Sequence, residues 1–178
     1  VRDLLKVFET FDFRVLPVEV IGSILETLIP QEEKRKFGQY FTNPILADLV
    51  TFPAIKNNKD ILFDPTCGTG SILESMYRIL KHYGISEHTR LLQQVWGNDI
   101  SHFPAIMSVI NLYKQEINQN ENFPRVLRSD FFELKPKETV SFPDPMDIDK
   151  LKKEELPQFD AIVSNFPFIQ QEDIQSDR

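Results

Sequence analysis

The amino-acid sequence predicts an α/β fold in which helices cover a parallel β-sheet. Two observations predict this class. Short apolar runs alternate with segments of helical periodicity from residue 60 to residue 165, and each of these short runs ends in Asp or Asn. Such alternation is typical of βαβ units, whose strands are parallel and whose helices lie on both faces of the sheet.

The composition is that of an ordinary globular domain. Hydrophobic residues make up 41% and charged residues 26% of the 178 residues, which excludes a disordered chain and leaves room for a small helical appendage. The net charge of −7 argues against a surface that coats nucleic acid, but not against an enzyme that meets nucleic acid through a separate module. Cys67 is the single cysteine and the three histidines are scattered, so neither a disulfide framework nor a metal site is predicted.

The chain shows no sign of a membrane or secretory segment. No apolar run reaches the ~18 residues that cross a bilayer, and no secretory signal is visible. We therefore expect a cytoplasmic protein without a membrane partner. The first residue is Val1 rather than Met, so the natural N-terminus is expected upstream.

Residues 1–52 form the first predicted unit, a helical segment. It ends in a short helix that Asn43 caps and Pro44 begins. A longer helix is predicted between Pro17 and Pro30, because one apolar stripe runs along it. The stripe consists of Val20, Ile21, Ile24, Leu25 and Leu28.

Residues 53–178 form the second predicted unit, which carries the sheet. Its predicted strands are 60–64, 94–99, 125–130 and 159–165, and its predicted helices are 72–83 and 105–113. The stretch 135–158 holds four prolines, so we expect a long loop there with a short helix over 149–156.

Each predicted strand ends in a polar residue: Asp64, Asp99, Asp130 or Asn165. Because the carboxyl ends of parallel strands form the ligand crevice of an open sheet, four polar side chains there predict a site. The alternative is that each one merely caps a helix or starts a turn. The glycines of the first turn favour the site.

The turn after the first strand, from Asp64 to Gly70, contains two glycines in the pattern G-x-G. Glycines at this position allow a ligand to approach the backbone closely. The pattern is not a dinucleotide fingerprint, because Leu73 stands where the third glycine belongs, and no Gly-Lys-Ser/Thr of a P-loop follows. The carboxylate before the turn favours a cationic ligand over a phosphate.

Three ordered motifs resemble one family. Asp64-Pro-Thr-Cys-Gly-Thr-Gly-Ser-Ile-Leu73 resembles the S-adenosylmethionine-binding loop of amino-methylating DNA methyltransferases. Gly38-Gln-Tyr-Phe-Thr-Asn-Pro44 resembles the additional cofactor motif of adenine-N6 enzymes of the type I modification-subunit kind, and Asn165-Phe-Pro-Phe168 resembles their catalytic Asn-Pro-Pro-aromatic motif. The resemblance implies a Rossmann-like class I methyltransferase sheet, incomplete at the C-terminus, with an N-terminal helical segment that includes motif 38–44.

The resemblance also implies which residues bind the cofactor. Asp64 would hold the methionine amino group, Asp99 the ribose hydroxyls and Asp130 the adenine amino group. Ile100 and Phe131 would pack near the adenine ring, and motif 38–44 would close over the methionyl end. The full implied set is Tyr40, Phe41, Thr42, Asp64, Thr66, Gly68, Gly70, Ser71, Asp99, Ile100, Asp130 and Phe131.

The resemblance assigns the chemistry to Asn165, Phe166, Pro167 and Phe168. The Asn165 side-chain oxygen and the carbonyl of residue 166 would accept the two N–H groups of a target amine and direct its lone pair at the methyl group. Phe168 would stack on a base that has swung out of the duplex. Phe166 stands where the family usually has Pro, but it supplies the same backbone carbonyl.

The expected partners are DNA, reached through a recognition module or subunit outside this chain, and specificity and restriction subunits. We expect the 178-residue chain to be a fragment that binds cofactor weakly and does not methylate DNA alone. Methylation of RNA guanine or protein glutamine stays an alternative, as does a non-catalytic scaffold. A nicotinamide enzyme is disfavoured by the missing glycine.

Overall fold

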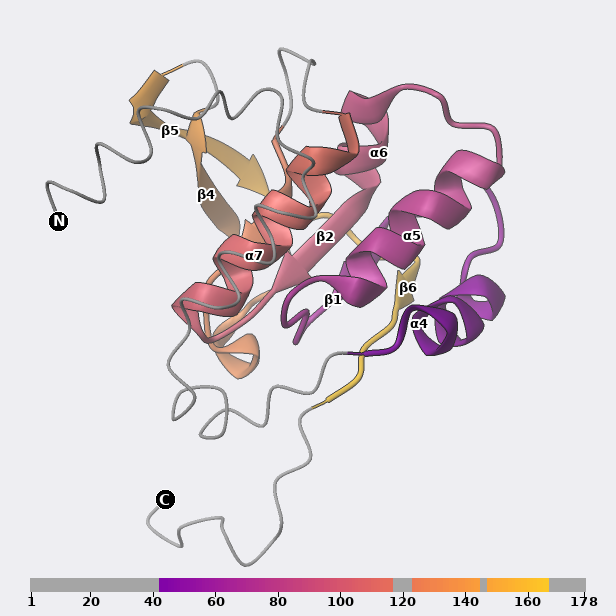
Figure 1. Cartoon of the computed structure of the whole chain (residues 1–178). Coiled ribbons are helices and arrows are strands. Elements are labelled where there is room, and N and C mark those ends of the chain that lie inside the picture. The colour runs from indigo at the N-terminus through magenta and orange to yellow at the C-terminus, as the bar shows by residue number, and fades with distance from the viewer. Residues whose placement is uncertain (1–41, 117–122, 145–146, 167–178) are drawn as a thin grey trace, which may run out of the picture.

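The computed structural model describes residues 42–116, 123–144 and 147–166 (Figure 1). Several sequence-based predictions lie outside these residues. They are the predicted helices before residue 42 and the site residues Tyr40, Phe41, Pro167 and Phe168.

A parallel sheet forms the centre of the described fold. Its strands are β1 (Leu62–Asp64), β2 (Val95–Asn98), β3 (Arg125–Leu127) and β6 (Ala161–Ile162), in the spatial order β3-β2-β1-β6 (Figure 1). This confirms the four predicted strands, although each is shorter than predicted. The chain steps from β1 to β2 to β3 and then returns to the other side of β1 with β6. Such a reversal is a topological switch point, where open α/β sheets place their ligands.

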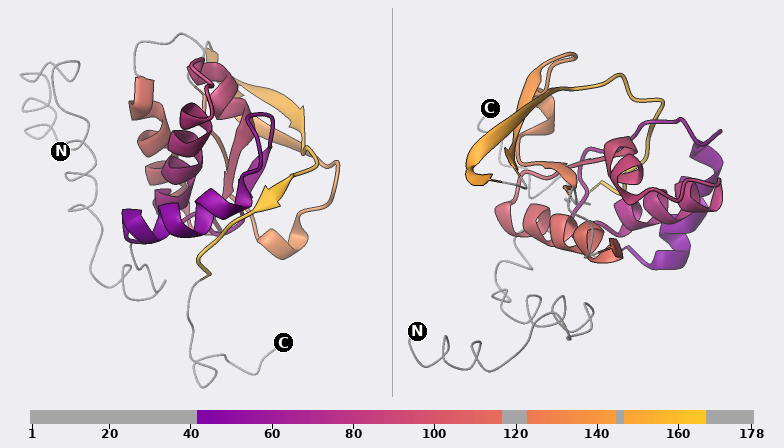
Figure 2. Two further views of the ribbon diagram at one scale, coloured as in Figure 1. Left: turned by 90° about the vertical axis from the view of Figure 1, so that its right-hand side faces the viewer. Right: turned by 90° about the horizontal axis from the view of Figure 1, so that it is seen from above.

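Helices cover one face of this sheet (Figure 2). They are α4 (Pro44–Thr51), α5 (Ser71–His82), α6 (His88–Gln94) and α7 (His102–Tyr113), with the short 3-10 turns η1 (Phe52–Ala54) and η2 (Lys114–Glu116) after α4 and α7. Leu62 of β1 and Val95 of β2 point into the core under the helices, and the adjacent Phe63 and Trp96 point to the opposite face. The predicted helices at 44–52, 72–83 and 105–113 are confirmed.

A β-hairpin covers the opposite face (Figure 2). It consists of β4 (Thr139–Asp144) and β5 (Asp147–Glu155), which pair antiparallel. The expectations of a long loop with a helix over 149–156, and of helices on both faces, are therefore wrong for the described residues. The alternating side chains Val140 and Phe142 explain the strand, because both are buried against Phe63 and Trp96 in one aromatic core. The four prolines of this stretch had favoured a loop, but the two strands pair despite them.

Helix α6 was not predicted. It begins at His88 after Glu87, whose side chain makes no capping hydrogen bond, and it passes directly into β2 at Val95. The sequence therefore offers neither a start nor a stop signal. Within the part of the chain that the structure describes, no helix has the length and apolarity to cross a membrane.

Candidate functional site

The ends of β1 and β6 meet at the switch point and are tied by hydrogen bonds. Ser164, which follows β6, donates from Oγ to Oδ1 of Asp64 at 2.7 Å. Thr66 Oγ1 lies 2.6 Å from Ser164 Oγ, and because the Ser164 hydroxyl hydrogen is directed at Asp64, Thr66 is the donor of this pair. The Thr66 backbone N–H donates to the same carboxylate oxygen at 3.1 Å. A hydrogen-bond chain thus links two strand ends that are 100 residues apart in sequence.

Asp64 is a buried carboxyl group with an unusual pKa. Its side chain is 1% exposed. Burial raises the pKa of Asp64 to about 7, although the hydrogen bonds from Ser164 and Thr66 lower it, and the nearby charge of Asp99 adds to the rise. Both donors act on Oδ1, and no described residue donates to Oδ2. Such a carboxyl group ionises readily when a cation lies beside it.

The turn after β1 has the backbone geometry that its glycines predict. Gly68 and Gly70 have φ angles of 53° and 93°, values that residues with a side chain rarely adopt. Two residues of α7 hold the turn: Ser108 Oγ donates to the Gly68 carbonyl at 2.7 Å, and Asn111 Nδ2 donates to the Thr69 carbonyl at 2.8 Å. Neither supporting residue was predicted, because isolated polar residues on an otherwise apolar helix give no sequence signal for a loop contact.

Asp99 joins the turn after β2 to the glycine turn. Its Oδ2 accepts a hydrogen bond from the Gly68 N–H at 3.0 Å, and its Oδ1 accepts one from the Ser101 N–H at 2.8 Å. Burial raises the pKa of Asp99, and these two hydrogen bonds oppose the rise. The carboxylate is only partly buried, so it can accept further hydrogen bonds from a ligand. Ile100 beside it is exposed.

Asn98 at the end of β2 holds the other loops in place. Its Nδ2 donates to the carbonyls of Pro65 at 3.0 Å and Ser129 at 3.1 Å, and its Oδ1 accepts from Ser129 Oγ at 2.8 Å. The side chain is buried, and it joins the loops that follow β1, β2 and β3. A role was predicted for Asp99 but not for the adjacent Asn98. The signal was present, since a polar residue at a buried strand end needs partners.

Asp130 lies at the end of the loop after β3, where it caps the short turn η3 (Phe131–Glu133). Its Oδ1 accepts a hydrogen bond from the Phe132 N–H at 3.0 Å. Phe131 packs on the aromatic core, with its ring centroid 6.2 Å from that of Phe63, whereas Phe132 is 89% exposed. Among the described residues, Asp130 forms no hydrogen bond with Asp64 or Asp99, and its place in the predicted site rests on the position of β3 beside β2 in the sheet.

Asn165 lies beside Thr42, a residue of the upstream motif. Asn165 Nδ2 donates to Thr42 Oγ1 at 3.2 Å across 123 residues of sequence. Asn165 and Phe166 are exposed. The fold therefore brings together, at one edge of the sheet, the glycine turn with Thr66 and Ser71, Asp99 with Ile100, and the pair Thr42 and Asn165.

Comparisons with known proteins show the family to which the chain belongs. The family model for N-6 DNA methylases matches residues 18–178, so the chain belongs to this family. The type I restriction enzyme MjaVII methylase subunit of Methanocaldococcus jannaschii is 27% identical over 126 residues, which are 67% of this chain and 20% of that protein.

A solved structure shares the fold. It is the crystal structure of a modification subunit ascribed to a type I restriction enzyme of Vibrio vulnificus YJ016, which is 17% identical and superposes with a TM-score of 0.52. The match covers 76% of this chain and 30% of that one. The fold is therefore the α/β methyltransferase sheet that the sequence predicts, and the chain spans less than a third of either relative.

Proposed function

We propose that this chain is the catalytic part of an S-adenosylmethionine-dependent methyltransferase that modifies N6 of adenine in DNA. One observation carries the proposal. The buried Asp64 with its glycine turn follows β1, Asn165 follows the neighbouring strand β6, and Ser164 joins the two strand ends through its hydrogen bond to Asp64. A cofactor bound beside Asp64 and an amine bound by Asn165 would then lie at the same end of two neighbouring strands, as methyl transfer between them requires.

The described residues fit the cofactor. When bound, S-adenosylmethionine supplies an electrophilic methyl group on a cationic sulfonium. Asp64, with a pKa near 7, would ionise beside the cationic methionyl end, and the turn through Gly68 and Gly70 presents backbone rather than side chains there. Asp99 and Asp130 would accept hydrogen bonds from the ribose and the adenine, with Ile100 and Phe131 beside the ring. Tyr40, Phe41 and Thr42 would close the methionyl end.

Asn165 would bind the target amine. Its Nδ2 is engaged by Thr42, which leaves Oδ1 to accept one amino N–H, and the carbonyl of Phe166 accepts the other. Two acceptors withdraw the nitrogen lone pair from conjugation with the base and fix its direction. Phe168 would stack on the base. No residue needs to form a covalent bond to the substrate.

We infer that DNA and further subunits complete the system. Both relatives belong to type I restriction enzymes, and an acidic chain of net charge −7 is poorly suited to hold a polyanion by itself. Specificity and restriction subunits, or a recognition module elsewhere in the protein, would supply the DNA contacts. The expected place of action is the cytoplasm.

Calorimetric titration with S-adenosylhomocysteine tests the cofactor site. We expect saturable binding by the chain, and an affinity at least tenfold weaker for Asp64→Asn at pH 7.5. Asp160→Asn is the matched control, because Asp160 caps Ile61 at the opposite end of the sheet; its affinity should stay within twofold of the original. Absence of saturable binding would favour the scaffold alternative and overturn the proposal.

Transfer of a labelled methyl group identifies the substrate. The protein, supplied with its specificity partner, should label N6 of adenine in duplex DNA and not RNA guanine or a glutamine peptide. Asn165→Ala should abolish labelling while S-adenosylhomocysteine still binds, because Asn165 acts on the amine rather than on the cofactor. Label in RNA or peptide would instead establish one of the alternatives.

A further inference from the structure

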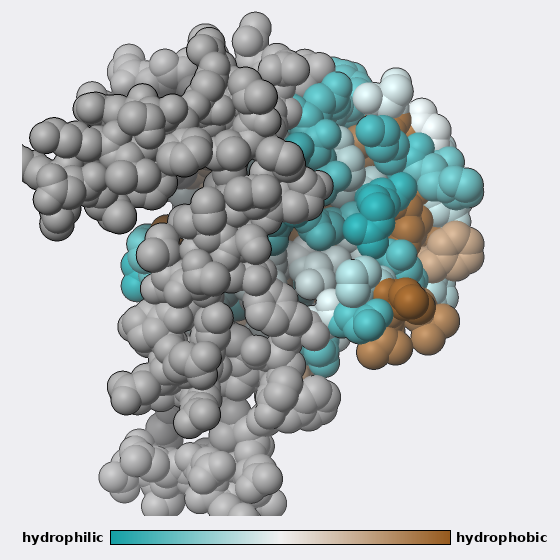
Figure 3. All heavy atoms as spheres, viewed as in Figure 1, coloured by the Kyte–Doolittle hydropathy of each residue, from teal (hydrophilic) through white to brown (hydrophobic). Residues whose placement is uncertain are grey.

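Helix α4 exposes an apolar face to solvent. Ala47 and Thr51 turn inward and are buried, but the outward positions are apolar as well. Figure 3 shows hydrophobic surface gathered at the side of the molecule where Figure 1 has α4. The exposed residues are Ile45 at 77%, Leu46 at 55%, Leu49 at 68%, Val50 at 47% and Phe52 at 57%. Exposed apolar residues gathered on one helix normally mark a surface that another element covers.

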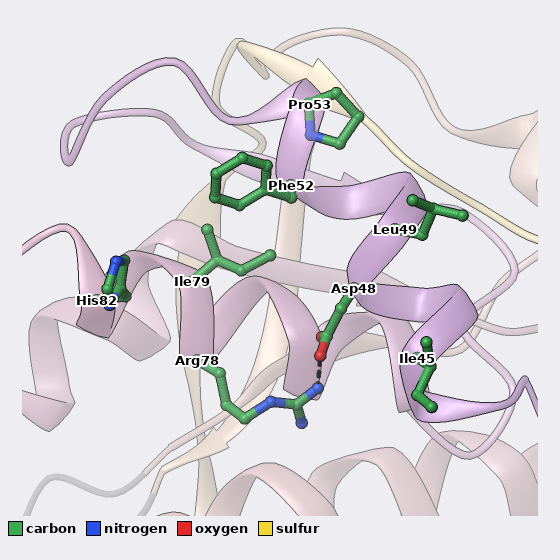
Figure 4. Close-up of a pocket in the computed structure, with 8 residues that line it drawn as sticks. All are labelled: Ile45, Asp48, Leu49, Phe52, Pro53, Arg78, Ile79 and His82. Atoms are coloured by element: carbon green, nitrogen blue, oxygen red, sulfur yellow. Dashed lines mark hydrogen bonds and ion pairs between the residues drawn. The ribbon is translucent and has the colours of Figure 1, made fainter.

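The apolar face continues into a groove between α4 and α5. Ile45, Leu49 and Phe52 follow one another at helical spacing along one wall, and Ile79 of α5 lies opposite (Figure 4). Arg78 and His82 form a polar rim on α5. The groove has a volume of about 640 Å³, which is enough for several apolar side chains of a docked element.

Asp48 and Arg78 stabilise the shape of the groove. Asp48 Oδ1 accepts hydrogen bonds from Ser75 Oγ at 2.5 Å and from Arg78 Nη2 at 2.6 Å, which joins α4 to α5. These bonds lower the pKa of Asp48, the bond from Ser75 most. The groove is therefore a fixed feature between two joined helices, and Arg78 keeps further N–H donors for an acidic partner.

We propose that residues 17–30 of this same chain cover the α4 face as an amphipathic helix. These residues lie outside the described structure, and the described chain begins at Thr42, directly before the helix that needs covering. The stripe from Val20 to Leu28 needs an apolar partner, and the only charged residues between 17 and 30 are Glu19 and Glu26, whose charge is opposite to that of Arg78 in the rim. The proposal is independent of the methyltransferase assignment.

The connection has the right length. Residues 31–41 join the segment to Thr42, and a chain of eleven residues can extend to at most roughly 36–40 Å, whereas α4 is only about 12 Å long. A tether of this reach gives a millimolar effective concentration, which favours an intramolecular occupant over a separate partner. The helix formed by residues 17–30 would then pack against α4 beside α5.

Cysteine cross-linking tests the proposal. Leu49→Cys is combined with a second cysteine on the predicted stripe, at Ile21, Ile24 or Leu28, or at the control positions Glu19, Ser23 or Glu26. After oxidation, more than half of the chains with a stripe cysteine should contain the intrachain cross-link. Less than a tenth of the chains with a control cysteine should contain it. Leu49→Cys alone measures any background from the buried Cys67.

Labelling of Leu49→Cys by a maleimide gives a second, independent measurement. In the otherwise unchanged chain the thiol should react at least tenfold more slowly than in a variant with Ser at positions 21, 24 and 28. Glu87→Cys, an exposed position outside the groove, should react equally fast in both backgrounds. Equal rates at position 49, or cross-links formed between two chains, would overturn the proposal, the latter in favour of a second copy of the chain as occupant.

Discussion

At the scale of single residues, Asp64 is a buried carboxyl group whose ionisation lowers the stability of the folded chain. A carboxyl group that is 1% exposed is costly to ionise, and its pKa of about 7 expresses this cost. Ser164 and Thr66 offset part of it through hydrogen bonds to one oxygen. A cationic ligand would offset the rest, so the free protein is strained electrostatically at the position where binding is proposed.

The stability of the chain should therefore depend on Asp64 and pH. Because the folded pKa is raised, the folded state holds a proton that the unfolded state releases, and this stabilisation is complete below about pH 4 and lost as pH rises to about 7. Asp64→Asn should remove this loss and be more stable than the original at pH 8 by roughly 2–4 kcal/mol. Urea unfolding at pH 5 and pH 8 measures it; an equal stability difference at both values would contradict the argument.

Ligand affinity should show the opposite dependence on pH. The ammonium group of S-adenosylhomocysteine would bind the ionised carboxylate, so the affinity for this ligand should rise between pH 5.5 and 7, by at most about tenfold per pH unit. Asp64→Asn should bind weakly with no such slope. Calorimetry in matched buffers measures both; a flat profile for the original chain would show that Asp64 does not face the cationic end.

Gly70 is required because helix α7 packs closely against its Cα atom. A Cβ atom on Gly70 would lie 3.1 Å from Cα and Oγ of Ser108, whereas Gly84, with a similar φ of 95°, has no atom within 4 Å of its Cβ position. Gly84→Ala should cost about 1 kcal/mol from backbone strain alone, and Gly70→Ala at least about 2 kcal/mol. Chemical denaturation compares the two; equal costs would mean that α7 shifts freely.

At the scale of elements, the hairpin β4–β5 takes the place of a covering helix. Its apolar residues meet the rings of Phe63 and Trp96, and Arg125 of β3 fastens it. Arg125 donates from Nε and Nη2 to the two carboxylate oxygens of Glu154, at 2.6 and 2.9 Å, and from Nη1 to the Leu92 carbonyl at 3.2 Å. Burial raises the pKa of Glu154, but Arg125 outweighs it and leaves this pKa below its ordinary value.

Loss of this clamp should loosen the hairpin. Arg125→Met should destabilise the chain by roughly 2–4 kcal/mol, because Glu154 keeps only Lys152 at 3.4 Å as its cationic partner among the described residues. Arg125→Lys should recover little, since an ammonium group cannot form the two-pronged contact. The free energy of unfolding and hydrogen exchange of β5 measure the effect. Full recovery by Lys would show that charge alone matters.

At the scale of the whole molecule, the site belongs to the junctions between strands. Residues from the ends of β1, β2 and β6 and from α7 meet there, so binding should stabilise the complete described fold rather than one element. S-adenosylhomocysteine at a hundred times its dissociation constant should add about 2.7 kcal/mol, which corresponds to a melting temperature roughly 5–10 °C higher. Thermal unfolding measures it, and Asp64→Asn should lose most of the shift at the same ligand concentration.

The sequence by itself determined the four strands of the parallel sheet, the helices α4, α5 and α7, the glycine turn and the polar residues after the strands, because periodicity and turn chemistry are local properties. It also placed Asp64 at the carboxyl end of β1, and Asp99, Asp130 and Asn165 in the segments that follow the carboxyl ends of β2, β3 and β6. Only the tertiary structure decided which residues distant in the sequence contact one another. The roles of Asn98, Ser108 and Ser164 as supports, and the hairpin in place of a helix, depend on partners distant in the chain. Local patterns cannot encode such partners, because burial and pairing arise only when the chain is folded.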